Sequence, residues 1–223
     1  MQALIIVVLI AGFIVLLVAG VISARKRRDA MTAMAAKLGL HFEPQKDYNL
    51  AKRYKFLDKL RAGSNQYAFN ILSGTFREHE VMVFDYHYET YSTDSKGHRQ
   101  TDHYYFSFFI LLMPVSFPEL LICKEGFFSK IAQALGYDDI DFESYEFSRK
   151  FCVRSKDKKF AYDVCNGRMI EYLLANTDLT IEIENNVLTI SFNSQLSPER
   201  IEPNLNRLVE LRSLMPGYLF SGR

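Results

Sequence analysis

The side chains best suited to chemistry lie between residues 85 and 103. Asp85, His87 and Glu89 alternate along the chain, so their side chains would share one face of a β-strand. If residues 101–108 pair back on residues 84–91, imidazoles and carboxylates converge and could bind a divalent metal such as zinc or manganese. The alternative is a solvated strand face beside a polar loop. The ligands that the sequence predicts are Asp85, His87, His98 and His103.

Other catalytic signatures are absent from the sequence. It has no glycine-rich phosphate loop, no nucleophile elbow and no HExxH zinc motif. Its cysteines, Cys123, Cys152 and Cys165, form no CxxC pair and are odd in number. They therefore predict neither a disulfide framework nor a zinc site. No cofactor is expected, and a non-catalytic protein- or lipid-interaction module is favoured. An enzyme with an unrecognised, metal-dependent site on the 85–103 hairpin is the alternative.

The N-terminal segment is strongly apolar. Residues 3–24 carry no charge, and about 20 apolar residues in a helix span a bilayer core of roughly 30 Å. Met1 and Gln2 provide no basic residue before this run, which argues against a cleaved signal peptide. The sequence therefore predicts an uncleaved transmembrane signal-anchor helix over residues 1–24, with the lipid bilayer as a partner.

A basic run follows this segment directly. Because positive charge beside a membrane helix is retained in the cytoplasm, we expect the N-terminus outside and the rest of the chain inside. The protein would then be a single-pass protein of the cell (inner or plasma) membrane with a soluble cytoplasmic domain. Without these four charges the net charge of +1 becomes −3, so nucleic acid is not expected as a partner. The residues that set this topology are Arg25, Lys26, Arg27 and Arg28.

An apolar stripe continues beyond the basic run. Met31, Met34, Ala35 and Leu38 follow helical spacing, so residues 25–38 are expected to form a basic flank and a juxtamembrane helix that docks on the domain. Residues 39–223 read as an α+β domain with antiparallel strands and helices. A weak internal echo suggests related halves at 39–118 and 119–223, the second containing a helix at 127–135; chance similarity is the alternative.

The clearest predicted element is a hairpin over residues 179–192. A turn at Asn185–Asn186 places Ile181, Ile183, Leu188 and Ile190 on one face. The other face is largely polar, so we expect one face on a core and one toward solvent.

A second functional feature is a basic cluster. Six cations fall within 11 residues that contain one acid, Asp157. Such a cluster could contact anionic lipid headgroups or an acidic region of an unknown protein partner, whereas the alternative is an ordinary solvated face. The cations are Arg149, Lys150, Arg154, Lys156, Lys158 and Lys159.

Several short motifs carry a resemblance to a known group of proteins. They are FDYHY at 84–88, HRQT at 98–101, DIDF at 139–142 and FSRK at 147–150. Over roughly residues 30–215 the chain resembles uncharacterised bacterial membrane-anchored proteins of similar length. The resemblance implies an anchor-plus-domain architecture in a bacterial membrane and no catalytic residue.

Overall fold

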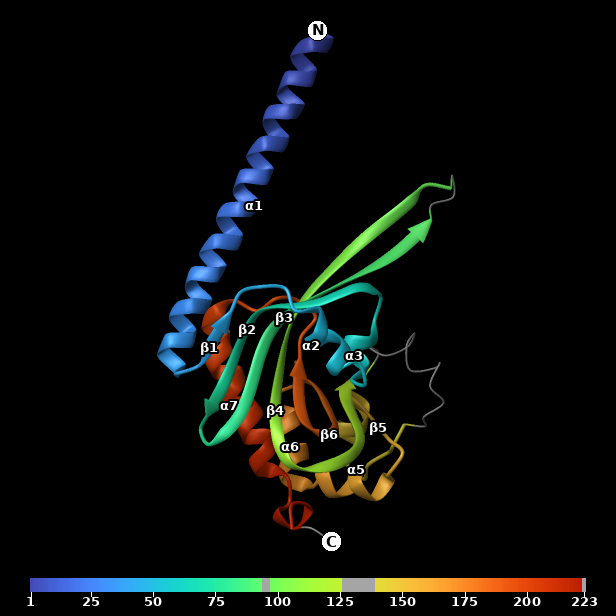
Figure 1. Ribbon diagram of the computed structural model, residues 1–223. Helices are drawn as coiled ribbons and strands as arrows, with labels where there is room; N and C mark the ends of the chain where they lie inside the picture. Colours follow the sequence, from blue (N-terminus) through green and yellow to red (C-terminus); the bar gives the residue numbers. More distant parts are fainter. Residues whose placement is uncertain (94–96, 126–138, 222–223) are drawn as a thin grey trace.

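The computed structural model describes residues 1–93, 97–125 and 139–221. The architecture is α+β, built on one antiparallel sheet in which the order is β1-β2-β3-β4-β5 and β6 pairs with β4 (Figure 1). The strands are β1 (His41–Glu43), β2 (Ser64–Phe76), β3 (His79–Thr93), β4 (Arg99–Lys124), β5 (Phe151–Ser155) and β6 (Thr180–Ser191).

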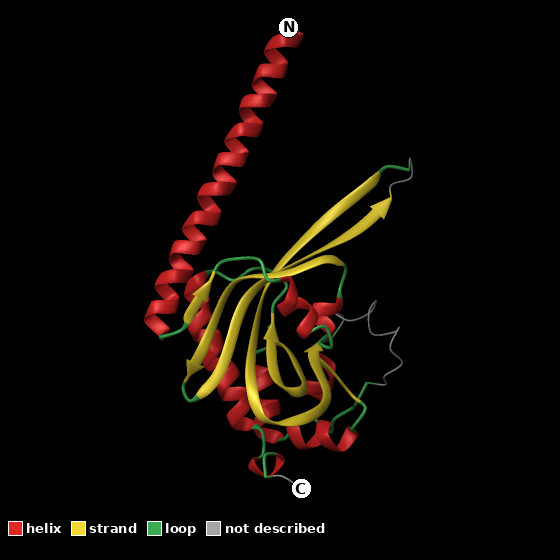
Figure 2. Cartoon of the chain, viewed as in Figure 1, coloured by secondary structure: helices red, strands yellow, loops and turns green. Residues whose placement is uncertain are grey.

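Helices cover both faces of the sheet, as the secondary-structure view shows (Figure 2). The α-helices are α1 (Gln2–Leu38), α2 (Tyr48–Arg53), α3 (Asp58–Arg61), α4 (Tyr145–Lys150), α5 (Lys158–Val164), α6 (Gly167–Ala175) and α7 (Ile201–Leu214). Two single-turn 3₁₀ helices, η2 (Pro198–Arg200) and η3 (Gly217–Leu219), flank α7.

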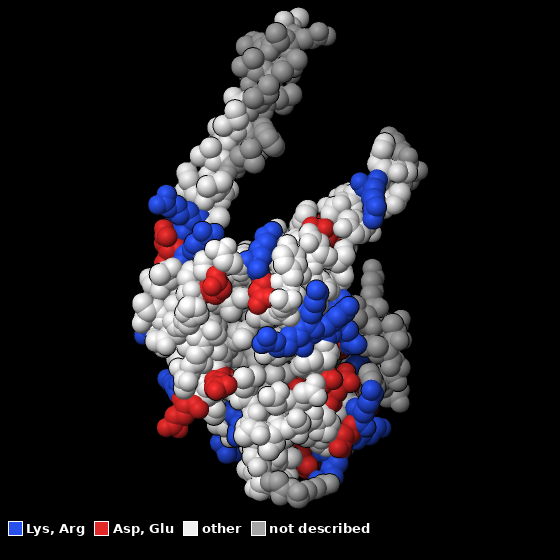
Figure 3. All heavy atoms as spheres, in the orientation of Figure 1, with Lys and Arg blue, Asp and Glu red and all other residues white. Residues whose placement is uncertain are grey.

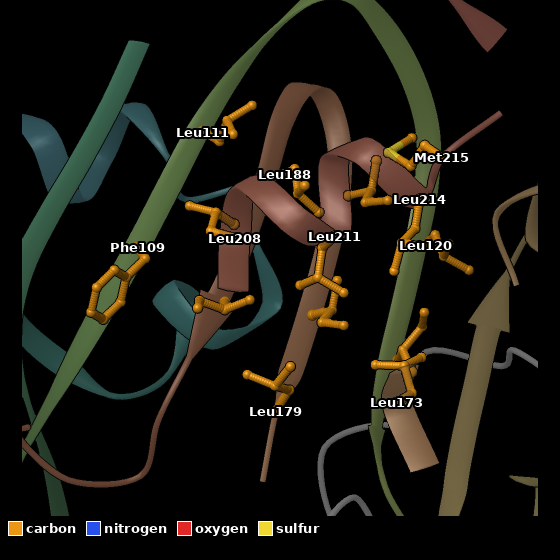
Figure 4. Packing of buried hydrophobic residues seen from close by; sticks show 14 of the residues in the cluster. Phe109, Leu111, Leu120, Leu173, Leu179, Leu188, Leu208, Leu211, Leu214 and Met215 are labelled. Atoms are coloured by element: carbon orange, nitrogen blue, oxygen red, sulfur yellow. The ribbon is translucent and has the colours of Figure 1, made fainter. Parts of the chain in front are cut away.

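Strand alternation divides the apolar side chains into two cores. Val83 of β3 lies opposite Phe109 of β4, and both belong to the larger core, which also contains side chains of α1 and α4 to α7. Phe84 lies opposite Phe108, and both belong to the smaller core under α2 and α3. Figure 4 shows Leu208 of α7 beside Phe109. Asp85, His87 and Glu89 continue the larger-core face of β3, because strand side chains alternate.

Strand β4 is long and bent. It continues through Pro114 and Pro118 to Lys124. Its pairing with β6 shifts register between Leu112 and Phe117, and again between Phe117 and Leu120. Proline has no N–H for the ladder, so the two prolines fit these irregularities. Residues 99–107 of β4 pair in the ladder with β3 alone, which lets the β3–β4 hairpin extend away from the sheet.

Strand β6 forms the predicted apolar face, with Ile181, Ile183, Leu188 and Ile190 buried. Asn185 adopts the left-handed conformation, φ 52°, at the expected turn. The expectation that the opposite face is solvated is wrong, because Glu182, Val187 and Thr189 are also buried. Val187 belongs to the smaller core, and the backbone N–H groups of α3 bind the Glu182 carboxylate. Alternation identified the two faces but not the helices that cover the second one.

Helix α1 begins beyond the sheet and ends on it. Its last turns bury Met31 and Ala35 in the larger core, as the apolar stripe predicts. Gly39 closes it with φ 68°, a left-handed conformation that suits glycine. The helix is continuous across residues 24 and 25, so the segment that docks and the segment that projects belong to one element.

The predicted transmembrane span at residues 1–24 is wrong. Within the described part of the chain, no helix has the length and apolar character needed to cross a membrane. Three predictions that depended on this span are therefore wrong as well. They are the signal-anchor, the single-pass topology with the N-terminus outside, and the placement in the cell membrane. The prediction considered the apolar run alone, whereas the structure continues it into one 37-residue helix whose last turns are buried on the sheet.

The remaining sequence predictions concern the second half of the chain. The helix predicted at 127–135 lies outside the described residues. Strand β4 crosses the boundary proposed between 118 and 119, and all six strands belong to one sheet. The division into two related halves stays a prediction.

Candidate functional site

The candidate site lies at the base of a projecting hairpin. Strands β3 and β4 continue past the end of β2, and we call their outer ends (residues 88–93 and 99–104) the arm (Figure 1). The predicted pairing of residues 84–91 with 101–108 is confirmed, with Tyr91 opposite Thr101 and Phe84 opposite Phe108. The register follows from apolar and aromatic side chains that alternate on both strands.

Three of the polar side chains converge there, and we call them the His–Glu cluster (His87, Glu89 and His103). Glu89 lies directly opposite His103 in the β3–β4 ladder. His87 Nε2 lies 3.1 Å from His103 Nδ1. Glu89 Oε1 lies 3.4 Å from His103 Nδ1 and 3.9 Å from His87 Nε2. One ligand atom of each residue therefore faces a common point.

His87 is fixed by its surroundings. Only 2% of its side chain is exposed. The centroid of its ring lies 4.4 Å from the ring centroid of Tyr67 and 4.7 Å from that of Tyr105. Nδ1 lies 3.1 Å from the carbonyl oxygen of Asn65. If Nδ1–H donates to this carbonyl, the Nε2 lone pair faces the cluster. Burial lowers the pKa of His87, which favours the neutral imidazole.

Asn65 also positions the carboxylate. Its side-chain amide donates to Glu89 Oε1 at 2.6 Å, and the Tyr91 hydroxyl donates to Oε2 at 3.1 Å. The hydrogen bond from Asn65, helped by Tyr91 and the two imidazoles, lowers the pKa of Glu89. The carboxylate is therefore held ionised and in one orientation.

The backbone around Asn65 is specialised. Asn65 has φ 48° and lies where the β2–β3 register shifts, between Ser64 and Tyr67. Gly63, with φ 68°, precedes it, and a Cβ there would lie 2.3 Å from the carbonyl oxygen of Glu89. A bulge that needs a glycine and an asparagine thus delivers both polar groups of Asn65 to the cluster.

Asp85 does not join the cluster. Arg27 of α1 donates to both of its oxygens, Nε to Oδ2 and Nη2 to Oδ1, each at 2.8 Å. Asn70 and Ser107 donate to the same carboxylate at 2.9 and 3.1 Å. Arg27 also donates Nη1 to the Leu196 carbonyl at 2.7 Å. Asp85 therefore fastens α1 to the sheet, and the structure does not bring it to the other predicted ligands.

His98 does not join it either. It follows the arm's tip, just before the Thr93–Arg99 pair, and is exposed. It lies five positions before His103, about 16 Å along a strand. The structure therefore brings together two of the four predicted ligands, His87 and His103. Glu89 replaces Asp85, a choice that the alternating spacing allowed, whereas nothing in the sequence indicated Asn65.

The basic run beside α1 divides into two kinds of residue. Arg27 is largely buried in its ion pair with Asp85, whereas Arg25, Lys26 and Arg28 are exposed. Their predicted role in fixing a membrane topology is wrong, because it depended on a membrane span.

The second basic cluster, residues 149–159, extends over α4, β5 and α5. Lys150 pairs with Glu146 at 2.8 Å and Lys159 pairs with Asp163 at 3.0 Å. These acids neutralise part of the cluster's charge. Contact between this surface and anionic headgroups stays a prediction.

A second group of metal-ligand atoms surrounds Cys152, near Glu125 and Asp139. Cys152 is buried opposite Cys123 in the β4–β5 ladder, and both thiols are free. Asp139 already accepts a hydrogen bond from the Val153 N–H at 2.8 Å. The His–Glu cluster is the better site, because a backbone carbonyl and a side-chain amide orient its ligands toward one another.

Comparison with known proteins gives one structural likeness. The chain shares its fold with the mycobacterial trehalose monomycolate transport factor A, TtfA. The crystal structure of TtfA matches with a TM-score of 0.58 at 14% sequence identity, over 86% of this chain and 96% of TtfA. No protein-family model matches the chain, and no curated protein matches its sequence. At this identity the likeness to TtfA shows the fold alone.

Proposed function

We propose that this protein is a non-catalytic module that binds lipid with an anionic headgroup. The observation that carries the proposal is an exposed apolar surface on α1 that ends at exposed cations. An enzyme would use an enclosed site, whereas a lipid-binding module needs apolar surface beside matching charge.

The apolar surface lies on the projecting part of α1. Five large aliphatic side chains there are 49–69% exposed within nine residues. Single exposed apolar side chains are ordinary, but a contiguous group marks a surface that binds something apolar. These side chains are Ile14, Val15, Val18, Val21 and Ile22.

Charge and aromatic side chains adjoin this surface. Arg25, Lys26 and Arg28 are exposed in the turn that follows it, and Figure 3 shows basic side chains where α1 meets the domain. Each cation near an anionic lipid surface contributes about 1 kcal/mol to binding. The arm and the free part of α1 project from the same end of the domain (Figure 1). The arm exposes Tyr91 and Tyr104, and tyrosine is common at lipid–water interfaces.

The likeness to TtfA supports the same kind of ligand. TtfA is a transport factor for trehalose monomycolate, which is a lipid. A protein partner, the alternative that the sequence leaves open, would use the same apolar surface, and it becomes an outcome of the test below.

The test is co-flotation of the full chain with vesicles. We expect the chain to bind phosphatidylglycerol vesicles at low salt and to bind pure phosphatidylcholine vesicles more weakly. The double variant V18D/I22D places two charges on the apolar surface and should reduce binding at least tenfold. The double variant K26E/R28E should remove the preference for anionic lipid.

The matched control adds the same charge elsewhere. Tyr145→Asp with Tyr218→Asp changes two exposed aromatic residues of α4 and η3, and this variant should bind as the parent does. Absence of binding to either kind of vesicle would eliminate the lipid proposal and leave a protein partner for the α1 surface. If the control variant lost as much vesicle binding as V18D/I22D, the added charge rather than the α1 surface would account for the loss.

A further inference from the structure

We propose that His87, Glu89 and His103 form a binding site for a Zn²⁺ ion. This inference is separate from the lipid-binding proposal, because the site lies at the base of the arm and uses none of the α1 residues. It is carried by the spacing of three ligand atoms and by the groups that orient them.

The spacing suits a single ion. Ligands bound to zinc at roughly 2.0–2.1 Å in tetrahedral geometry lie about 3.3 Å from one another. The distances from His103 Nδ1 to His87 Nε2 and to Glu89 Oε1 are 3.1 and 3.4 Å. The third distance, between His87 Nε2 and Glu89 Oε1, is 3.9 Å. A small movement of the Glu89 carboxylate would bring all three atoms to bonding distance of one point.

The groups around the ligands have the roles that zinc sites require. A histidine that binds zinc usually donates its other ring N–H to a carbonyl or carboxylate, which fixes the tautomer. The Asn65 carbonyl lies where it accepts this hydrogen bond from His87 Nδ1. Asn65 Nδ2 and the Tyr91 hydroxyl hold the carboxylate of Glu89. The ligands are thus oriented by the fold before an ion arrives.

The donor set and the exposure define the kind of site. Two imidazoles and one carboxylate favour zinc and related first-row metals over calcium or magnesium, which prefer oxygen ligands. His87 is buried, whereas 51% of the His103 side chain is exposed. Three protein ligands leave a fourth position, and it would open toward solvent on the His103 side. This arrangement is the one found in zinc sites that bind water or a substrate group.

The experiment measures zinc affinity of the chelator-treated full chain by competition with a chromophoric chelator. We expect one high-affinity Zn²⁺ per chain. His103→Ala and Glu89→Gln should each weaken binding at least tenfold. His103 is half-exposed and glutamine keeps the shape of glutamate, so both variants should fold; circular dichroism checks this. Cobalt added in place of zinc should give the visible absorption of a four-coordinate ion.

The matched control is His98→Ala, which removes an exposed histidine that directly precedes β4 and lies outside the cluster. It should bind zinc with the affinity of the parent chain. Zinc binding that is absent from the parent, or that survives both His103→Ala and Glu89→Gln, would overturn the proposal. So would a loss in His98→Ala equal to that in His103→Ala, since the ligands would then lie toward the tip of the arm.

Discussion

Two carboxylates on one face of β3, those of Asp85 and Glu89, have different surroundings and different roles. Asp85 lies beneath α1 with 1% of its side chain exposed, and side-chain donors of three residues, Arg27, Asn70 and Ser107, bind it. Glu89 lies four residues further along the strand at the base of the arm, where it faces two imidazoles and solvent. The two positions share a strand, a face and an acidic side chain, and differ in what covers them.

The difference shows that the role of an acidic residue depends on whether a helix packs over it. Beneath α1, a charge can be buried only if it is fully paired, and the pairing leaves Asp85 no capacity for a ligand. At the arm, the helices no longer cover the sheet, so Glu89 and His103 keep their approach to solvent. A structural role at Asp85 and a binding role at the His–Glu cluster follow from this division.

The largest expected effect on stability comes from breaking the ion pair between Arg27 and the buried Asp85. Arg27→Ala leaves the buried Asp85 carboxylate without its cation, and loss of one partner of a buried ion pair costs about 3–5 kcal/mol. We expect a decrease of this size in the free energy of unfolding, measured by urea denaturation. Arg28→Ala, an exposed neighbour on the same helix, should change it by less than about 0.5 kcal/mol. Equal effects of the two substitutions would mean that Arg27 contributes no more than surface charge.

A third carboxylate, buried on β6, sharpens the comparison. Glu182 accepts hydrogen bonds from the backbone N–H groups of Asp58 and Lys59 at 2.7 and 3.1 Å. Burial raises its pKa from the ordinary 4.5 to about 7, although Lys59 and Arg61 nearby oppose this shift. The folded protein therefore keeps a proton on Glu182 that the unfolded chain releases.

Stability should consequently fall as pH rises. The contribution of Glu182 is fully present below pH 4.5 and is lost as pH rises through about 7; a pKa change of this size corresponds to at most roughly 3 kcal/mol. Glu182→Gln should remove this part of the pH dependence, measured by urea denaturation between pH 4.5 and 8. Glu80→Gln, at an exposed position of β3, should keep it. Identical pH profiles for the parent and Glu182→Gln would contradict the assignment.

The smallest effect on stability is expected at the solvent-accessible His–Glu cluster. His103→Ala removes a half-exposed side chain, so the free energy of unfolding without metal should change by less than about 0.5 kcal/mol. Zinc at 100 times its dissociation constant should stabilise the parent by about 2.7 kcal/mol and leave the variant unaffected. Thermal denaturation with and without zinc measures both. A large destabilisation without metal would make His103 structural, as Asp85 is, and would remove the contrast.

Part of the candidate site could be predicted from the sequence. Alternation placed His87 and Glu89 on one face. The pairing of residues 84–91 with 101–108, which the sequence analysis took as a condition, brings His103 beside them. The sequence could not separate Asp85 from Glu89, because both satisfy the same alternation. It also gave no sign of Asn65, whose function depends on a left-handed backbone and a shift in register.

The sequence by itself determined what depends on local periodicity: the α+β class, the helical stripe that buries Met31 and Ala35, and the faces of β3 and β6. Tertiary structure alone decided which charges are covered. Arg27 reaches Asp85 across 58 residues of chain, and Glu182 meets α3 across 124. These pairings reflect where distant elements pack, and neither the apolar run of α1 nor its basic neighbours indicated that packing. A buried charge must find its partner in space, and local sequence patterns do not record that partner.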